Sequence, residues 1–408
     1  IRDIGTTIKM GILFKDWIPG KEYFHGFGES DQSRESFFND RRTDETSAIH
    51  SIINDLYCGG QNYHVPSNEI PSTDLSFSHA LHIDTQKFLD ILYNKFKDRV
   101  EFIDDIVEEV NVEGNNITSI ECKNSGVIDA DFYIDASGFN SILFKHLNPK
   151  WIDVSNILPI DRAIPQQVSN NSDELPSYTL AEATDNGWIW QLPIGDRYGT
   201  GYLYSSKFTS DEEAKEKYNK WLLENHNTEL TTDRIIKYRP GYYENNWIGN
   251  CMAVGLSSGF VEPIESTGIA IISKQIYNFV VFNSALNNLN YTRKFLNKLN
   301  FDLYTEAVNF IALHYNTNRT DSDFWDYMTN NKSEWVKDIQ ERCENEFIDV
   351  SIFDNARTNI WSFDSYILIL HGLGFFNKDS IMDYLRAKPN GNQILDHSER
   401  LFNKEQIR

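Results

Sequence analysis

Apolar and polar residues recur with recognisable spacing in the first part of the chain, where they predict short strands around one helix. The alternation over residues 7–17 is typical of a strand. Apolar residues at helical spacing over 80–96 predict a helix, and Asp84 is placed to cap it. Further short strands are predicted at 100–102, 106–112, 117–122 and 132–134, with a hairpin turn at 114–116.

The pattern becomes β-rich in the middle of the chain and helical after it. Strands are predicted at 177–182, 188–192, 198–204 and 235–238, and the first three form an antiparallel sheet. Residues 210–227 read as an amphipathic helix with Ser210 as its cap and Glu212 and Glu213 in its first turn. Helical patterns then cover 291–315, 333–349 and 379–387.

One run, Gly259-Phe-Val-Glu-Pro-Ile-Glu-Ser-Thr-Gly-Ile269, combines two carboxylates, a proline, two hydroxyls and a glycine. A short buried strand precedes it and apolar residues at helical spacing follow it, so it reads as a strand-to-helix crossover. Backbone N–H groups and the positive end of the helix dipole gather at such a start, which suits an anion. Glu265 beside it is therefore either a helix cap or a reactive group.

Composition and charge narrow the function classes. The 408-residue chain is long enough for two or three lobes, and its net charge of −22 argues against a nucleic-acid partner. The sequence shows no apolar run of about 18 residues and no signal peptide, so we expect no membrane span. Four widely spaced cysteines favour reduced thiols and a cytoplasmic protein without structural zinc.

Other residues invite both an ordinary and a functional interpretation. Lys9 taken alone is a solvated strand residue or a functional amine. His25 and Phe27 belong to an aromatic cluster that is either core or the wall of a pocket for a planar ligand. The turn Asp135-Ala-Ser-Gly138 is an ordinary strand end or a place where backbone approaches a ligand closely. Trp188 and Trp190 share one face of a strand, as paired core rings often do.

Several motifs follow one another in an order that carries a resemblance. Trp188-Ile-Trp-Gln-Leu-Pro193 is similar to a WxWxIP signature, and Phe260-Val-Glu-Pro-Ile-Glu-Ser-Thr-Gly-Ile269 matches a second signature almost residue for residue. Further matches are Asp135-Ala-Ser-Gly-Phe139, Leu158-Pro-Ile-Asp-Arg-Ala163, Gly199-Thr-Gly-Tyr-Leu-Tyr-Ser-Ser206, His314-Tyr315 and Arg319-Thr-Asp-Ser-Asp-Phe-Trp325. With Lys9 in its strand before them, most of the chain resembles the flavin-dependent halogenases of the tryptophan-halogenase family.

The resemblance implies roles for individual residues. Lys9 matches the family's essential lysine and Glu265 its essential glutamate, so both are implied to be catalytic. The other implied roles are halide binding by Thr267 and Gly268, substrate binding by His25, Phe27 and Trp361, a barrier between flavin and substrate at Trp188, Trp190 and Pro193, and cofactor binding by Asp135, Gly138, Gly255, Pro263 and Ile269.

The resemblance also implies a fold class and a division of the chain. The fold is α/β, of the FAD-dependent monooxygenase type (PHBH-type, GR2), with a β-rich substrate sheet and a C-terminal helical lobe. The implied parts are an N-terminally incomplete FAD-binding domain with a substrate-pocket strand over 1–156, the antiparallel substrate sheet over 157–245, a last FAD-domain segment with the halide and glutamate turn over 246–290, and the helical substrate lobe over 291–408. The family's GxGxxG βαβ unit is absent from the printed chain, and we expect it to precede Ile1 in the natural protein, the alternative being a protein without a complete FAD site.

The implied activity is FADH2- and O2-dependent halogenation of an electron-rich aromatic, of the indole or phenol type, through hypohalous acid relayed to Lys9. In the family a separate flavin reductase supplies reduced FAD, and halide (chloride, bromide or iodide) is a co-substrate. A homo-oligomer is compatible with the sequence. Free-tryptophan halogenases carry a tyrosine pair that Phe353-Asp-Asn-Ala-Arg-Thr-Asn-Ile-Trp361 lacks, which puts free tryptophan in doubt as the substrate. The alternatives are an aromatic hydroxylase of the same fold and a non-catalytic relative that only binds.

Overall fold

The computed structural model describes residues 6–27, 80–170, 175–285, 289–345, 360–361 and 363–375. The chain divides into two compact units. The first unit takes Ile1–Phe88, Arg162–Ile236 and Ala312–Arg408, and the second takes Leu89–Asp161 and Lys237–Ile311. The four-part division inferred from the sequence stays a prediction, and the helix expected at 379–387 lies outside the described residues.

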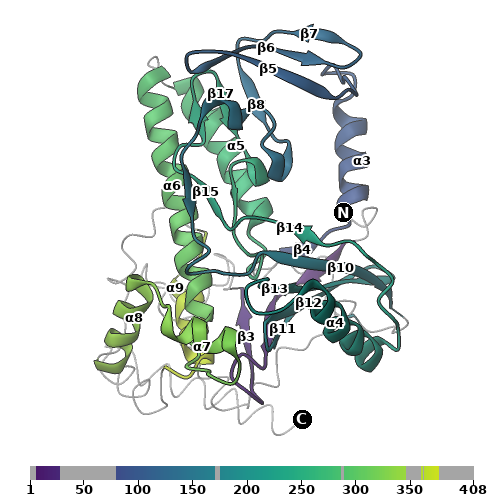
Figure 1. Cartoon of the computed structure of the whole chain (residues 1–408), viewed down its shortest axis with the longest axis vertical. Helices are drawn as coiled ribbons and strands as arrows, with labels where there is room; N and C mark the ends of the chain where they lie inside the picture. Colours follow the sequence, from purple (N-terminus) through teal and green to yellow (C-terminus); the bar gives the residue numbers. More distant parts are fainter. Residues whose placement is uncertain are drawn as a thin grey trace, which may run out of the picture. The chain divides into compact units, whose positions relative to one another are not determined.

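A seven-stranded sheet in the order β14-β10-β13-β12-β11-β2-β3 is the framework of the first unit (Figure 1). Strand β2 runs parallel to β11, whereas β10, β13, β12 and β11 are joined by antiparallel ladders. A separate two-stranded ladder pairs β1 with β4. The strands of this unit are β1 (Thr7–Lys9), β2 (Gly11–Lys15), β3 (Glu22–Gly26), β4 (Ala80–His82), β10 (Arg162–Ser169), β11 (Tyr178–Thr184), β12 (Gly187–Ile194), β13 (Arg197–Tyr204) and β14 (Ile236–Lys237).

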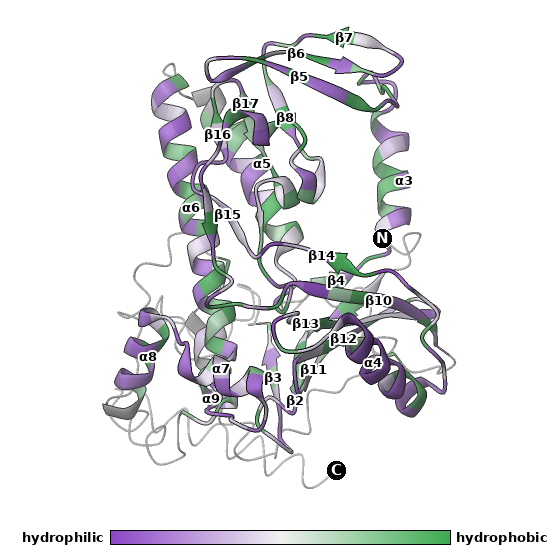
Figure 2. Ribbon diagram, viewed as in Figure 1, coloured by the Kyte–Doolittle hydropathy of each residue, from purple (hydrophilic) through white to green (hydrophobic). Residues whose placement is uncertain are grey.

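Helix α4 (Asp211–His226) packs against this sheet and forms a hydrophobic core with it. Tyr218 and Leu222 of the helix are fully buried in one cluster with Tyr202 of β13. The helix starts as predicted, because the Ser210 hydroxyl accepts from the Glu213 backbone while the Glu213 side chain returns to the Ser210 backbone. Figure 2 shows α4 as mostly hydrophilic, as expected for a helix that buries only one narrow face.

Among the described residues, three more helices belong to the first unit. They are α7 (Asp323–Asn330), α8 (Glu334–Asn345) and α9 (Phe363–Gly372). Helix α9 lies against β3, and its Gly372 packs so tightly that a Cβ there would come within 2.2 Å of the Tyr23 ring. Strand β3 carries His25, and Phe27 follows the strand directly, so this packing helps to fix the position of both predicted substrate-binding residues.

In its described residues, the second unit contains three small sheets and two long helices. The sheet orders are β18-β15-β9, β16-β17-β8 and β5-β6-β7. Its elements are α3 (Thr85–Phe96), which begins in the first unit, β5 (Val107–Glu113), β6 (Asn116–Cys122), β7 (Gly126–Ile128), β8 (Tyr133–Asp135), the 3-10 turns η3 (Gly138–Asn140) and η4 (Phe144–Leu147), β9 (Trp151–Asp153), β15 (Gly241–Tyr243), β16 (Trp247–Ile248), β17 (Cys251–Ala253), the 3-10 turn η5 (Gly255–Ser257), β18 (Gly259–Phe260), α5 (Gly268–Ala285) and α6 (Leu289–His314), whose last residues belong to the first unit. Among the described residues, no helix has both the length and the apolar character needed to cross a membrane.

Two predictions for residues 80–102 need correction. The predicted helix begins later, at Thr85, because residues 80–82 form β4 and pair with β1. The strand predicted at 100–102 is wrong. Val100 and Phe102 are about half exposed (52% and 55%) and form no ladder, so no neighbouring strand satisfies their backbone.

Candidate active site

Lys9 lies in a buried aromatic setting in the first unit. It ends β1 opposite Ala80 of β4, and only 4% of it is exposed. Its Nζ atom is 5.5 Å from the centroid of the Phe27 ring, and the buried His25 ring lies edge-on to Phe27 with 6.3 Å between centroids. The structure thus brings the predicted Lys9, His25 and Phe27 together, with a cation against an aromatic face.

The tryptophan-bearing strand is hydrogen-bonded to the strand that carries Lys9. Thr7, two residues before Lys9, donates from Oγ1 to the Pro193 carbonyl oxygen over 2.7 Å. Pro193 lies on β12 with Trp188 and Trp190, which share one face because they are two residues apart. The three predicted barrier residues therefore belong to the strand that anchors β1.

Trp190 occupies space that a glycine leaves open. Gly201 is its partner across the β12–β13 ladder, and a Cβ at Gly201 would come within 2.0 Å of the Trp190 ring and 2.6 Å of the Ile164 carbonyl oxygen. The ring therefore lies over bare backbone. A side chain at position 201 would have to displace the ring and β10 as well.

We expect Gly201→Ala to lower the free energy of unfolding by about 1–3 kcal/mol, the usual cost of overpacking. Urea unfolding measures the change. Gly199→Ala is the matched control, since it lies on the same strand and its Cβ would meet only side-chain atoms at 3.6 Å or more. An equal loss in both variants would show that the position of Trp190 does not depend on Gly201.

In the second unit, three of the predicted cofactor-binding residues lie on two adjacent turns. Strands β8 and β17 run parallel with Asp135 opposite Ala253, so the turns after their carboxyl ends are neighbours. The Ser257 hydroxyl donates to the Gly138 carbonyl oxygen over 3.1 Å, which joins the turn after Asp135 to the turn that begins at Gly255. Ligands of open α/β sheets bind at such strand ends.

The side chain of Asp135 is fully used in hydrogen bonds within the turn that follows it. Its two carboxylate oxygens accept hydrogen bonds from the backbone of Ser137, Leu143 and Phe144 and from the Ser137 hydroxyl. Burial would raise the pKa of Asp135, but these hydrogen bonds outweigh it and hold the pKa below its usual range. The carboxylate therefore stays ionised and shapes the loop, and its binding of a cofactor stays a prediction.

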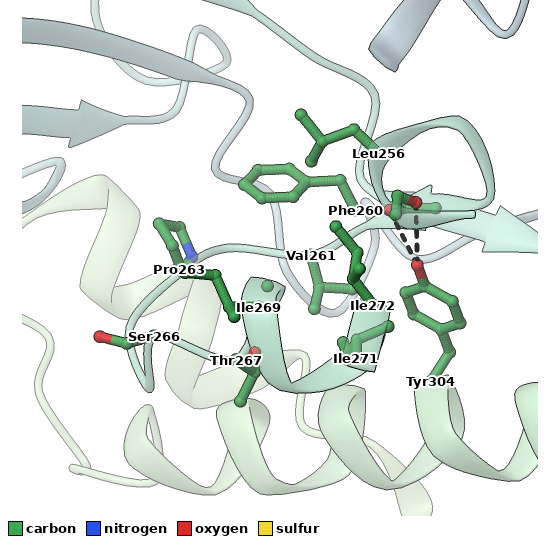
Figure 3. Close-up of a pocket in the computed structure, with 13 residues that line it drawn as sticks. Leu256, Phe260, Val261, Pro263, Ser266, Thr267, Ile269, Ile271, Ile272 and Tyr304 are labelled. Carbon is green, nitrogen blue, oxygen red and sulfur yellow. Dashed lines mark hydrogen bonds between the residues drawn. The ribbon is translucent and has the colours of Figure 1, made fainter. Parts of the chain in front are cut away.

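A cavity of about 290 Å³ lies at the start of α5 (Figure 3). The predicted Gly255, Pro263, Thr267, Gly268 and Ile269 all line it. The rest of the lining is mainly apolar and includes Leu256, Phe260, Val261, Ile271 and Ile272. This lining suits a flat apolar ring, and the size is close to the lower limit of about 300 Å³ for small-molecule pockets.

Besides the side chains of Ser266, Thr267 and Tyr304, backbone N–H groups contribute to the polar part of this cavity. Helix α5 begins at Gly268, where a Cβ would meet nothing within 4 Å, and the first N–H groups of a helix have no acceptor within it. Together with the helix dipole they favour an anion. Glu265 precedes this start and is buried, at 8% exposed. Between them Ser266 takes the left-handed conformation, with φ of 58°, and Figure 3 shows its side chain directed away from Tyr304.

Two residues that the sequence did not indicate support the cavity. Tyr304 of α6 donates from its hydroxyl to the Gly259 carbonyl oxygen over 3.0 Å, and Gln275 of α5 accepts from the Gly255 backbone over 2.8 Å. Burial raises the pKa of Tyr304, so its hydroxyl keeps the proton that it donates. Helical spacing placed both residues on helices but gave no sign of which turn they reach. The remaining predicted residue, Trp361, is buried in the first unit.

Comparisons with known proteins agree with the motifs. A family model described as tryptophan halogenase matches residues 1–388. The tryptophan 7-halogenase RebH of Lentzea aerocolonigenes is 32% identical over 321 residues, which are 73% of this chain and 59% of RebH. The tryptophan 6-halogenase SttH of Streptomyces toxytricini is 29% identical over 403 residues, which are 90% of this chain and 76% of SttH. The chain thus spans well under the full length of both relatives.

Solved structures show the same fold. The crystal structure of SttH superposes with a TM-score of 0.76 at 25% identity and covers 98% of this chain and 84% of that one. BrvH, a flavin-dependent halogenase from Brevundimonas sp. BAL3, superposes with a TM-score of 0.73 at 25% identity and covers 97% of this chain and 87% of that one. The α/β fold of FAD-dependent monooxygenases expected from the sequence is therefore confirmed. On its motifs, its fold and the match of the family model over residues 1–388, this chain belongs to the tryptophan halogenase family.

Proposed function

We propose that the protein halogenates an electron-rich aromatic of the indole or phenol type, using reduced FAD from a separate reductase, O2 and halide. The observation that carries the proposal is the buried Lys9 amine beside Phe27, on a strand bonded to the tryptophan-bearing strand, in a member of this family. Reduced FAD, when bound, supplies the two-electron reduction of O2 that turns one halide and one proton into hypohalous acid and water.

The residues around the cavity in the second unit fit a flavin ring. Leu256, Phe260 and Ile269 would contact its apolar faces, and the open backbone at Gly268 leaves room for close approach. Thr267 and Gly268 would hold halide with N–H groups at the start of α5. Gly138 and Gly255 would lie along the rest of the cofactor.

Lys9 would pass the halogen to the substrate. Its amine either hydrogen-bonds hypohalous acid or exchanges an N–H for an N–halogen bond and releases water. The ring carbon then takes the halogen and loses its proton, which regenerates the amine in the second case. Trp188, Trp190 and Pro193 would keep the ring from the oxidising cofactor, which excludes hydroxylation.

Glu265 would act on the ring rather than on the oxidant. Electrophilic attack places positive charge on the aromatic ring, and a buried carboxylate stabilises that charge and accepts the departing proton. At 8% exposed, Glu265 is shielded from water, which strengthens its field. His25, Phe27 and Trp361 would contact the substrate.

The test is product analysis with the full natural protein, a flavin reductase, NADH, FAD and O2, with bromide and a panel of indoles and phenols. We expect a brominated product with the two-line bromine isotope pattern that is absent when bromide or the reductase is omitted. A product that gains oxygen instead would identify a hydroxylase, and unchanged substrate with bound FAD would identify a non-catalytic relative; either outcome would contradict the proposal.

A further inference from the structure

A buried chain of hydrogen bonds lies beneath the strand that carries Lys9. Thr7 Oγ1 is 3.1 Å from His82 Nδ1, and His82 Nε2 is 2.9 Å from Thr179 Oγ1. All three side chains are at most 7% exposed. Thr7 also donates to the Pro193 carbonyl oxygen. These hydrogen bonds therefore connect four strands, β1, β4, β11 and β12, through residues that are far apart in the sequence.

These contacts determine the tautomer of His82. The Thr7 hydroxyl has one proton and gives it to Pro193, because a carbonyl oxygen can only accept. Toward His82, Thr7 must then accept, so His82 Nδ1 carries the ring proton. His82 Nε2 is left as the acceptor for the Thr179 hydroxyl.

His82 is neutral in this setting. Burial lowers its pKa, and the positive charge of Lys9 lowers it further, to about 3. The other groups in contact with its ring nitrogens, from β1 and β11, are uncharged hydroxyls. A charged imidazole would have two donors, and Thr179 would then have to accept rather than donate.

The network acts on a short strand, which is also held at its end because Met10, the next residue, makes backbone hydrogen bonds to Ser177 and Phe27. Strand β1 is three residues long and belongs to a two-stranded ladder. Thr7 and Lys9 are two residues apart and therefore share a face, so the position of Thr7 sets that of Lys9. A shift of one residue in the ladder would turn Lys9 to the opposite face.

We propose that His82 is a positioning residue for Lys9: held between Thr7 and Thr179, it fixes β1 against the strand of Pro193 and so aims the Lys9 amine. This inference rests on the proposed function for its consequence in turnover. Its structural part, the tautomer and the placement of Lys9, can be measured without turnover.

The turnover test compares substitutions that remove or keep the donor at Nδ1. We expect His82→Leu to lower halogenated product per flavin oxidised by about a hundredfold, the loss typical of a reacting group misplaced by about 1 Å. His82→Asn, whose side-chain N–H₂ can replace Nδ1–H toward Thr7 but cannot replace Nε2 toward Thr179, should recover part of that loss. Thr179→Val should also lower the amount of product. Thr184→Val is the matched control: Thr184 lies on the same strand as Thr179, but its hydroxyl bonds to Tyr202 instead, so this variant should keep normal product formation.

Two measurements on the wild-type protein and on His82→Leu do not depend on activity. Nitrogen NMR of ¹⁵N-histidine-labelled protein should show His82, assigned by its loss in His82→Leu, as a neutral Nδ1–H ring between about pH 5 and 8. Reductive methylation followed by peptide mass spectrometry should modify Lys9 faster in His82→Leu than in the wild type.

An Nε2–H tautomer, equal product from His82→Leu and Thr184→Val, or unchanged methylation of Lys9 would each overturn the role of His82. Absence of halogenated product from the wild-type protein would instead contradict the proposed function. In that case the NMR and methylation results still decide whether His82 positions Lys9, so the two failures are distinguishable.

Discussion

Replacing Lys9 by alanine is expected to abolish halogenation while oxidation of reduced flavin and release of hydrogen peroxide continue. The reason is that Lys9 would act after the oxidant has formed, so its loss stops the transfer to the ring but not the consumption of O2. Lys9 is 4% exposed, and its Nζ atom is 5.5 Å from the centroid of the Phe27 ring, so water has little access to replace the amine. Product by mass spectrometry and flavin oxidation by absorbance are measured in the same reaction.

A second variant separates the chemistry of Lys9 from its packing. Alanine leaves a cavity in the buried site, whereas Lys9→Met retains most of the side chain without the amine. Both variants should fail to halogenate, and the methionine variant should unfold at a temperature closer to that of the wild type. Normal product formation by either variant would refute the role given to Lys9.

Glu265→Gln is expected to lower halogenation turnover by about two orders of magnitude or more, in the range for a positioned acid–base or electrostatic group. The amide has nearly the shape of the carboxylate but carries no charge and accepts no proton from the ring. Because Glu265 is 8% exposed, water cannot readily replace it. Steady-state kcat at saturating substrate measures the loss, and flavin oxidation should again continue.

Glu262 offers a matched comparison in the same turn. It is also buried, at 1% exposed, and lies three residues before Glu265. We expect Glu262→Gln to lose less turnover than Glu265→Gln. Equal losses would show that the total charge of this turn, rather than the carboxylate of Glu265, is what matters, and near-normal turnover in the Glu265 variant would rule out its proposed role.

Elements set by local interactions were predictable from the sequence. Helix α4 is an example, because Ser210 and Glu213 are three residues apart and form a capping box that needs no distant partner. Asp84 likewise caps α3 as expected, by accepting from the backbone of Gln86 and Lys87. Strand β12 and the start of α5 could also be located from their residue patterns.

Elements that depend on distant partners were less predictable. Residues 80–82 lie in a region with a helical pattern. They nevertheless form strand β4, because they pair with β1, which is more than 70 residues away in the sequence. Apolar residues at 100–102 suggested a strand, but these residues pair with no strand in the described part of the chain. A strand is stable only where another strand satisfies its backbone, and local spacing contains no information on that partner.

The candidate site divides in the same way. The sequence by itself determined the family motifs, which name Lys9, Glu265 and the start of α5, because each motif is a short contiguous run. Only the tertiary structure decided that Phe27 lies beside Lys9, that Tyr304 holds the turn at Gly259, and that His82 bonds Thr7 and Thr179. The physical reason is that hydrogen bonds and ring contacts act over a few ångströms, and folding alone brings these residues, which are 18 to 97 positions apart, within that reach.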